Sequence, residues 1–223
     1  MQNMFSNIKI AVNKKLYVKD PETSDLGKKI IQSSIILIDE LGFEKFTFKK
    51  LGQFIGSNES SIYRYFESKH KLLLYLSSWY WCWMEYKLVF ATANITNPMD
   101  KLKKAIEIVT ERIVDDTATK HINEAILNRI IILEFTKTFL TKEVDAENKE
   151  GFFLVYKNVI NRLITMIVDV NSDFKFAKSL ASSIVEGALH QHFLSQHLKT
   201  ITDCNDHNSP SDFYLKVVTA TLQ

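Results

Sequence analysis

The sequence is poor in the residues that build turn-rich or cross-linked folds. Its 223 residues include only 6 Gly and 3 Pro, which favours helices over turn-rich β structure. Its two cysteines, Cys82 and Cys204, lie far apart without metal-binding spacing and fit a reducing cytosol better than a disulfide scaffold. No apolar run approaches a membrane span, and the first residues lack the apolar core of a signal peptide. We therefore expect a cytoplasmic protein that has no contact with a membrane.

The sequence also lacks the patterns of common catalytic sites. It shows no nucleophile with an ordered histidine and carboxylate, and no glycine-rich phosphate loop. Glu186 and His190 are four residues apart on one expected helix, a spacing that suits two metal ligands. His192 and His197 would point to other faces, so surface or interface histidines are the preferred interpretation. We predict no enzyme, no cofactor and no metal site, with a small helical metalloenzyme as a remaining alternative.

Charge is spread unevenly along the chain. The net charge is +2, and 46% of the residues are apolar, enough for a sizeable core. Residues 1–75 contain 12 Lys and Arg against 8 Asp and Glu, so the basic excess lies in this part. Such an excess favours contact with phosphates, although an ordinary solvated surface would show it as well.

Residues 47–69 carry the most informative pattern. Thr47 can cap a helix that runs to Ile55, because its hydroxyl accepts a hydrogen bond from the first turn. Gly56 can adopt the positive φ that ends this helix. Asn58 can then cap a second short helix, expected over Glu59–Phe66. Two short helices joined by a tight turn that contains glycine are typical of a helix-turn-helix.

The second of these helices has one apolar face and one polar face. Ile62 and Phe66 are four residues apart and should both point inward. The remaining side chains offer hydroxyls, a carboxylate, a guanidinium and phenols, a mixture that suits base edges and phosphates. An aromatic run of this kind also occurs in ordinary cores. We predict that DNA is bound by Thr47, Lys49, Lys50, Glu59, Ser60, Ser61, Tyr63, Arg64, Tyr65 and Lys69.

These residues resemble the TetR family of bacterial one-component repressors. The run Ser61–Lys69 matches the family's order of a small residue, Leu, Tyr, a variable residue, His or Tyr, Phe and, after a break, Lys. Leu51 and Gly56 fall in register. Gly52 stands where the family usually has Ala, which should weaken the first helix by about 1 kcal/mol. Glu59 and Ser60 make the family's base contacts hard to transfer to this chain. From the chemistry of the side chains, we expect Thr47, Tyr63, Tyr65 and Lys69 to contact phosphates, and Glu59, Ser60, Ser61 and Arg64 to read base edges.

The expected fold is all-α, with a possible β-hairpin in an N-terminal extension, residues 1–20. Apolar residues alternate on both sides of Asn13 and Lys14, which predicts the hairpin. A basic arm of Lys9, Lys14 and Lys15 along the DNA backbone is the alternative. A three-helix DNA-binding domain should occupy residues 21–68, with a first helix from Asp20 and Pro21 to Leu41.

Residues 69–223 should form an antiparallel helical bundle. Helical periodicity predicts its helices over 69–93, 97–116, 122–140, 152–170, 173–198 and 211–222, with a charged loop over 141–151 and a polar break over 202–210.

The resemblance assigns ligand binding and dimerisation to this bundle. We expect an effector cavity lined by Trp79, Trp83, Tyr86, Phe90 and Leu133, although core packing is the default role of such residues. Small and branched residues on the last two helices suggest a homodimer interface, for which the candidates are Leu180, Ile184, Ala188, Phe213 and Val217. Packing within one chain would explain the same pattern.

Together these features predict a homodimeric, ligand-responsive transcriptional repressor. Its partners would be a near-palindromic double-stranded DNA operator, an unknown small-molecule effector and a second copy of the chain. A helical regulator that binds a partner protein and lacks DNA affinity is the main alternative.

Overall fold

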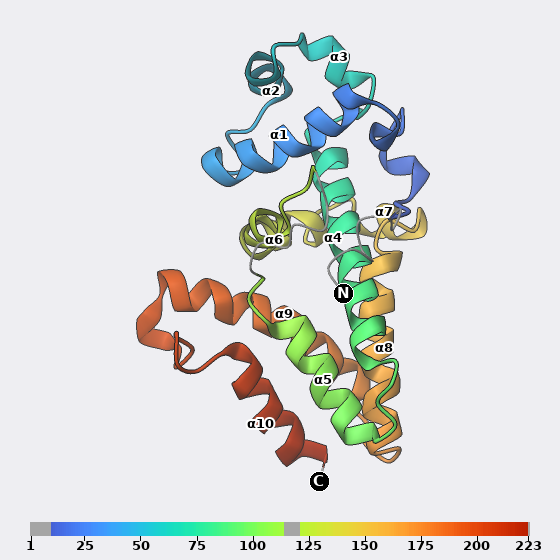
Figure 1. Ribbon diagram of the computed structural model, residues 1–223, viewed down its shortest axis with the longest axis vertical. Helices are drawn as coiled ribbons and strands as arrows, with labels where there is room; N and C mark the ends of the chain where they lie inside the picture. Colours follow the sequence, from blue (N-terminus) through green and yellow to red (C-terminus); the bar gives the residue numbers. More distant parts are fainter. Residues whose placement is uncertain (1–9, 114–120, 223) are drawn as a thin grey trace. The chain divides into compact units, whose positions relative to one another are not determined.

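The computed structural model describes residues 10–113 and 121–222, in which all regular structure is helical (Figure 1). The all-α prediction is therefore confirmed. The α-helices are α1 (Asp25–Leu41), α2 (Phe48–Ile55), α3 (Glu59–Tyr63), α4 (Lys69–Thr92), α5 (Pro98–Thr110), α6 (Glu124–Phe139), α7 (Val144–Lys149), α8 (Leu154–Val170), α9 (Ala177–His197) and α10 (Pro210–Leu222). Short 3-10 helices cover Lys14–Leu16, Pro21–Thr23 and Lys199–Ile201.

The chain forms two compact units. The first contains the chain up to Cys82 together with Ile113–Phe153, and the second contains Trp83–Arg112 together with the chain from Leu154 onward. Helix α4 therefore contributes residues to both units. The expected boundary after residue 68 separates DNA binding from ligand binding and dimerisation, whereas the two units are defined by compactness. This functional boundary stays a prediction.

Helix α1 begins and ends where local chemistry dictates. Ser24 caps it through a 3.2 Å hydrogen bond from the Gly27 amide to the serine hydroxyl. Gly42 ends it with a φ of 75°, and its amide donates to Ile38. The helix packs against α2 and α6 in the first unit, so its buried isoleucines support the helix-turn-helix from below.

The expected N-terminal hairpin is wrong for the described residues 10–19. Asn13 instead caps a 3-10 helix by accepting a 3.0 Å hydrogen bond from the Lys15 amide. Leu16 is fully buried, and the Val18 amide donates to the Tyr65 carbonyl at 2.8 Å. This segment packs against the rest of the first unit rather than against itself. Lys9 of the alternative basic arm lies outside the described residues, and Lys15 pairs with Glu150.

The stretch expected to be a loop, residues 141–151, contains α7. Its charged residues have partners that the periodicity could not reveal. Glu147 is 8% exposed and lies 2.7 Å from Nε2 of His70, and the Glu150 carbonyl accepts a 2.9 Å hydrogen bond from Asn13. Partners distant in sequence therefore stabilise a short helix that looks solvated in the sequence.

The second unit is built from the end of α4 and from α5, α8, α9 and α10. Helix α9 packs against α8, α5 and α10. The approach to α10 is close, because a β-carbon at Gly187 would lie 1.8 Å from the Tyr214 hydroxyl. No helix among the described residues is long and apolar enough to cross a membrane.

Two of the expected dimer residues pack inside the chain. Ile184 and Ala188 are 0% and 1% exposed, so they contact neighbouring helices of their own unit and are not available to a partner. This branched and this small side chain pack within one chain, which is the alternative noted above. Leu180 and Val217 are half-buried and Phe213 is 47% exposed, so these three remain candidates.

Candidate nucleic-acid interface

The turn between α2 and α3 is formed by the residues that the sequence indicated. The Thr47 hydroxyl accepts a hydrogen bond from the Lys50 amide at 3.2 Å, which caps α2. Gly56 adopts the left-handed conformation, with φ 68° and ψ 36°. Asn58 caps α3 by accepting from the Ser61 amide at 2.9 Å. These three local features confirm the predicted boundaries of the turn.

The backbone of the turn passes close to Gly52, a feature that helix propensity does not indicate. A β-carbon at this position would lie 2.9 Å from the Ser57 carbonyl oxygen and 3.2 Å from the Glu59 amide nitrogen. The turn therefore passes so close to α2 that a hydrogen is the only side chain that fits without movement of the backbone. Glycine here permits this close approach of the turn to α2.

The inward face of the motif is apolar. Ile62 and Phe66 are fully buried, as predicted, together with Leu51. Helix α3 ends at Tyr63, three residues earlier than expected, although the Phe66 amide still donates to the Ile62 carbonyl at 3.1 Å. This anchoring fixes the orientation of the short α3 relative to α2.

Tyr65 belongs to the support of the motif and not to its outer face, which corrects the expected phosphate contact. It is 4% exposed, and its hydroxyl lies 2.8 Å from the Ser24 hydroxyl and 3.5 Å from Nζ of Lys19. The hydrogen bond with Ser24 is the main cause that lowers the pKa of Tyr65 below its ordinary value. Tyr65 thus connects the segment after α3 to the start of α1.

Lys69 is likewise held by the scaffold. Its ammonium group donates to the carbonyls of Phe43, Glu44 and Phe46 at 3.0, 3.2 and 3.4 Å. It also lies 4.7 Å from the centre of the Phe43 ring, within cation–π range. The structure therefore replaces the expected phosphate contact with a bond from the start of α4 to the turn between α1 and α2.

The remaining predicted residues lie on the outer side of the motif. Thr47, Lys49, Lys50, Ser60 and Arg64 are exposed, and Glu59 and Ser61 are half-buried. Tyr63 is 49% exposed, and its ring packs edge-on against that of Phe48, with 5.0 Å between the ring centres. This face combines cations with hydroxyl and carboxylate groups, the mixture needed for phosphates and base edges.

Asn58 also controls the chemistry of the two serines of α3. Both hydroxyls donate to its Oδ1, Ser60 at 2.8 Å and Ser61 at 2.7 Å. Their hydrogens are thereby engaged, and the hydroxyl oxygens present lone pairs. With the Glu59 carboxylate, the start of α3 is a set of acceptors, suited to the amino groups of cytosine N4 and adenine N6.

Sequence reasoning missed several residues of this region. Nζ of Lys29 donates to the Ile55 carbonyl at 2.9 Å, and Ser24 holds Tyr65; both contacts join positions too distant in sequence for a local motif to indicate. Gln53 and Phe54 are exposed on α2, Phe54 by 53%. A helical wheel of α2 could have placed both outside the apolar face.

The residues expected to line an effector cavity do not share one environment. Trp79 and Trp83 are each 3% exposed and Tyr86 is half-buried. Phe90 is 47% exposed and Leu133 46%, so these two lie at the surface and not in an enclosed cavity, which corrects that part of the prediction. An effector role of the three inner aromatic residues stays a prediction.

A family model matches part of the N-terminal region. Residues 30–76 match the family model described as "Bacterial regulatory proteins, tetR family". This segment includes most of α1, the whole helix-turn-helix and the first turns of α4. A search of curated proteins finds no match.

Solved structures resemble most of the chain in fold. A tetR-family regulatory protein from Rhodococcus RHA1 superposes with a TM-score of 0.61 at 13% identity, covering 89% of this chain and 96% of that one. AibR in complex with isovaleryl coenzyme A and operator DNA gives 0.59 at 14% identity, covering 87% and 98%. The superantigen PfiT gives 0.60 at 15% identity, covering 92% and 99%. At these identities the likeness concerns the fold.

Proposed function

We propose, from the premise that this chain is a member of the TetR family of bacterial regulators, that it is a transcriptional regulator that binds double-stranded DNA and responds to a small molecule. The observation that carries the proposal is the outer face of α2 and α3. There, Lys49, Tyr63 and Arg64 are exposed, α3 begins with a set of acceptors, and Ile62 is buried. This combination of outward cations, hydroxyls and a carboxylate suits contact with phosphates and base edges.

The roles divide by chemistry. Thr47, Lys49, Lys50 and Tyr63 would bind phosphate oxygens and set the position of the motif. Glu59, Ser60 and Ser61 would read amino groups in the major groove, and Arg64 at the end of α3 would contribute a donor. This division predicts that loss of a phosphate contact weakens binding to every sequence, whereas a change at Glu59 alters the preferred base.

The regulator would act as a homodimer on a near-palindromic operator and would repress transcription. Two copies of α3 would enter successive major grooves, about 34–36 Å apart. The partly exposed Leu180, Phe213 and Val217 supply apolar surface for the second copy. The exposed Phe176, at 66%, extends this surface at the start of α9.

The proposed response to a small molecule is supported by the ligands found in proteins of similar fold. AibR was crystallised with isovaleryl coenzyme A and operator DNA, and FadR from Bacillus subtilis with stearoyl-CoA. In this chain the inner aromatic residues Trp79, Trp83 and Tyr86 are candidates for the apolar part of an effector. An effector would release DNA only if it binds the released conformation more tightly.

The test is selection of bound duplexes from a random pool, followed by titration of the selected sequence. The wild-type chain should enrich a sequence with two related half-sites. Tyr63→Phe should then weaken binding to all duplexes, and Glu59→Gln should change the selected base at one position in each half-site. If the pool yields no enriched sequence, the chain does not read DNA, and a helical regulator that binds a partner protein becomes the better account.

A further inference from the structure

The second unit contains a polar pocket of about 690 Å³ that the proposed DNA contacts and inner aromatic residues do not use. It is formed by the end of α5, the last turns of α9, the loop over residues 202–209 and the start of α10. Its volume lies within the usual range of small-molecule sites. The lining residues that matter for its chemistry are Arg112, His192, Gln196, Lys199, Asn205 and Asp206.

His192 makes one wall of this pocket rigid. The side chain is 8% exposed, and Nε2 donates a 2.9 Å hydrogen bond to the Thr110 carbonyl, which ties α9 to the end of α5. Burial is the main cause that lowers the pKa of His192, and the nearby charge of Arg112 lowers it further. The ring is therefore neutral near pH 7, with the proton on Nε2 and an acceptor lone pair on Nδ1.

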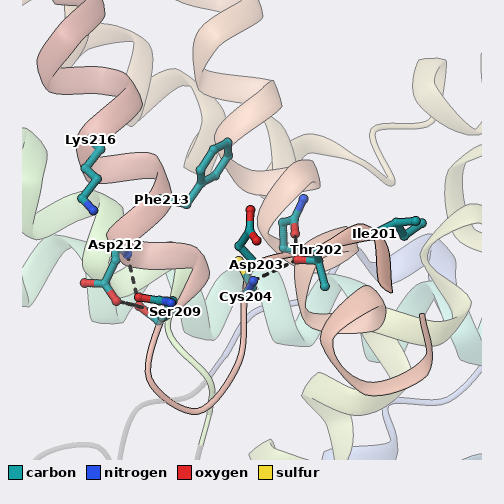
Figure 2. Close-up of a pocket in the computed structure, with 10 residues that line it drawn as sticks. Ile201, Thr202, Asp203, Cys204, Ser209, Asp212, Phe213 and Lys216 are labelled. Carbon is teal, nitrogen blue, oxygen red and sulfur yellow. Dashed lines mark hydrogen bonds between the residues drawn. The ribbon is translucent and has the colours of Figure 1, made fainter. Parts of the chain in front are cut away.

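The loop over residues 202–209, which also lines the pocket, is held in shape by hydrogen bonds. Thr202 donates to the Gln191 amide oxygen at 2.5 Å and accepts from the Cys204 amide at 3.1 Å. The Asn205 amide donates to the Asn208 carbonyl at 2.8 Å, which closes the loop. Figure 2 shows the adjoining pocket, which shares Thr202, Cys204 and Ser209 with this one, and some of these bonds. A wall built in advance spares a ligand the cost of ordering it.

The described part of the lining carries more positive than negative charge. Its cations are Arg112 and Lys199, and its carboxylate is that of Asp206. Within residues 10–113 and 121–222, neither cation forms an ion pair with a carboxylate. A concave surface that carries two cations without a carboxylate partner among the described residues attracts anions. A guanidinium can hold a carboxylate or phosphate through two parallel hydrogen bonds.

We propose that this pocket binds a small organic anion, whose carboxylate or phosphate group pairs with Arg112 and Lys199 and whose hydroxyl groups bond to the polar wall at His192 and Gln196. Binding at the pocket does not depend on the proposed function. A role of this pocket as an effector site does rest on the proposed function. In the chain, Arg112 is the last residue of the second unit before the first unit resumes at Ile113, so a ligand that holds Arg112 acts directly beside this connection.

Isothermal titration of the full chain tests the proposal with three probes: malate, glycerol 3-phosphate and inorganic phosphate. At least one of the two organic anions should bind saturably, with one site per chain, and which of them binds distinguishes a carboxylate from a phosphate head group. Inorganic phosphate should bind more weakly, because it lacks hydroxyl-bearing carbon atoms that reach the polar wall.

Variants locate the site. Arg112→Gln and Lys199→Gln should each weaken binding roughly tenfold or more, whereas Lys178→Gln, an exposed change on α9 outside the pocket, should leave it unchanged. Absence of saturable binding by all three probes would overturn the proposal. Equal weakening by all three variants would do the same, since it would show non-specific attraction of anions. If anion binding fails while DNA selection succeeds, the proposed function stands; the reverse result removes only that function.

Discussion

Substitution of Lys69 distinguishes most clearly between a role in supporting the helix-turn-helix and a role in contacting DNA. In the structure its ammonium donates to three carbonyls of the turn between α1 and α2. Lys69→Gln leaves these acceptors with at most two donors of a shorter, neutral side chain. Hydrogen bonds to charged groups contribute about 1.5–3 kcal/mol each when buried. Because this site is only half-buried, we expect a total loss of about 1–3 kcal/mol.

The assay combines two measurements on the same variant. Urea denaturation should show the lower free energy of unfolding. Fluorescence anisotropy with a selected duplex, repeated across salt concentrations, should give the same slope of log K against log salt as the wild type, because no phosphate contact is lost. Lys49→Gln is the matched control, since its side chain is exposed. It should leave stability unchanged and reduce the slope by about 0.9 for each bound chain.

The reasoning fails if Lys69→Gln reduces the salt slope as Lys49→Gln does and unfolds at the same urea concentration as the wild type. That result would place the ammonium on a phosphate and make the carbonyl contacts incidental.

Three further changes probe other parts of the structure. Gly52→Ala should destabilise the chain in urea despite the better helix propensity of alanine, about 1 kcal/mol, because the new methyl would lie 2.9 Å from the Ser57 carbonyl oxygen; a more stable variant would show that the turn yields easily. Tyr65→Phe should lose about 1 kcal/mol of stability, because the hydrogen bond to Ser24 is missing, and should leave the slope of log K against log salt unchanged. A smaller slope would indicate that Tyr65 contacts a DNA phosphate. The pKa of His192 is lowered by burial, so the unfolded chain binds a proton more readily; stability should therefore fall as pH drops from 7.5 through the ordinary pKa of 6.5, and comparison of urea curves should show that His192→Gln reduces this dependence.

Features that depend on residues close in sequence could be predicted, whereas those that depend on distant residues could not. Thr47, Gly56 and Asn58 act on residues at most four positions away, so their caps and turn could be predicted from local chemistry. The partner of Tyr65 is 41 residues distant, and those of Lys69 are 23 to 26 residues distant. No local pattern indicates such partners, which is why the sequence alone suggests DNA contacts for both residues.

Helical periodicity had a related limit in the second unit. It places Ile184 and Ala188 on one face of α9, yet it cannot say whether that face meets another helix of the same chain or a second copy. The structure shows that both are buried within the chain. The α7 segment shows the reverse, because charged residues that look solvated in sequence have distant partners such as His70.

The most direct measurement of the central claim is the affinity of the wild-type chain for a selected duplex and for a scrambled duplex of the same composition, across a series of salt concentrations. If the outer face of α2 and α3 reads DNA, log K for both duplexes should fall linearly with log salt, and the selected duplex should bind more tightly at every concentration. Equal affinity for the two duplexes, or affinity that does not change with salt, would contradict the account.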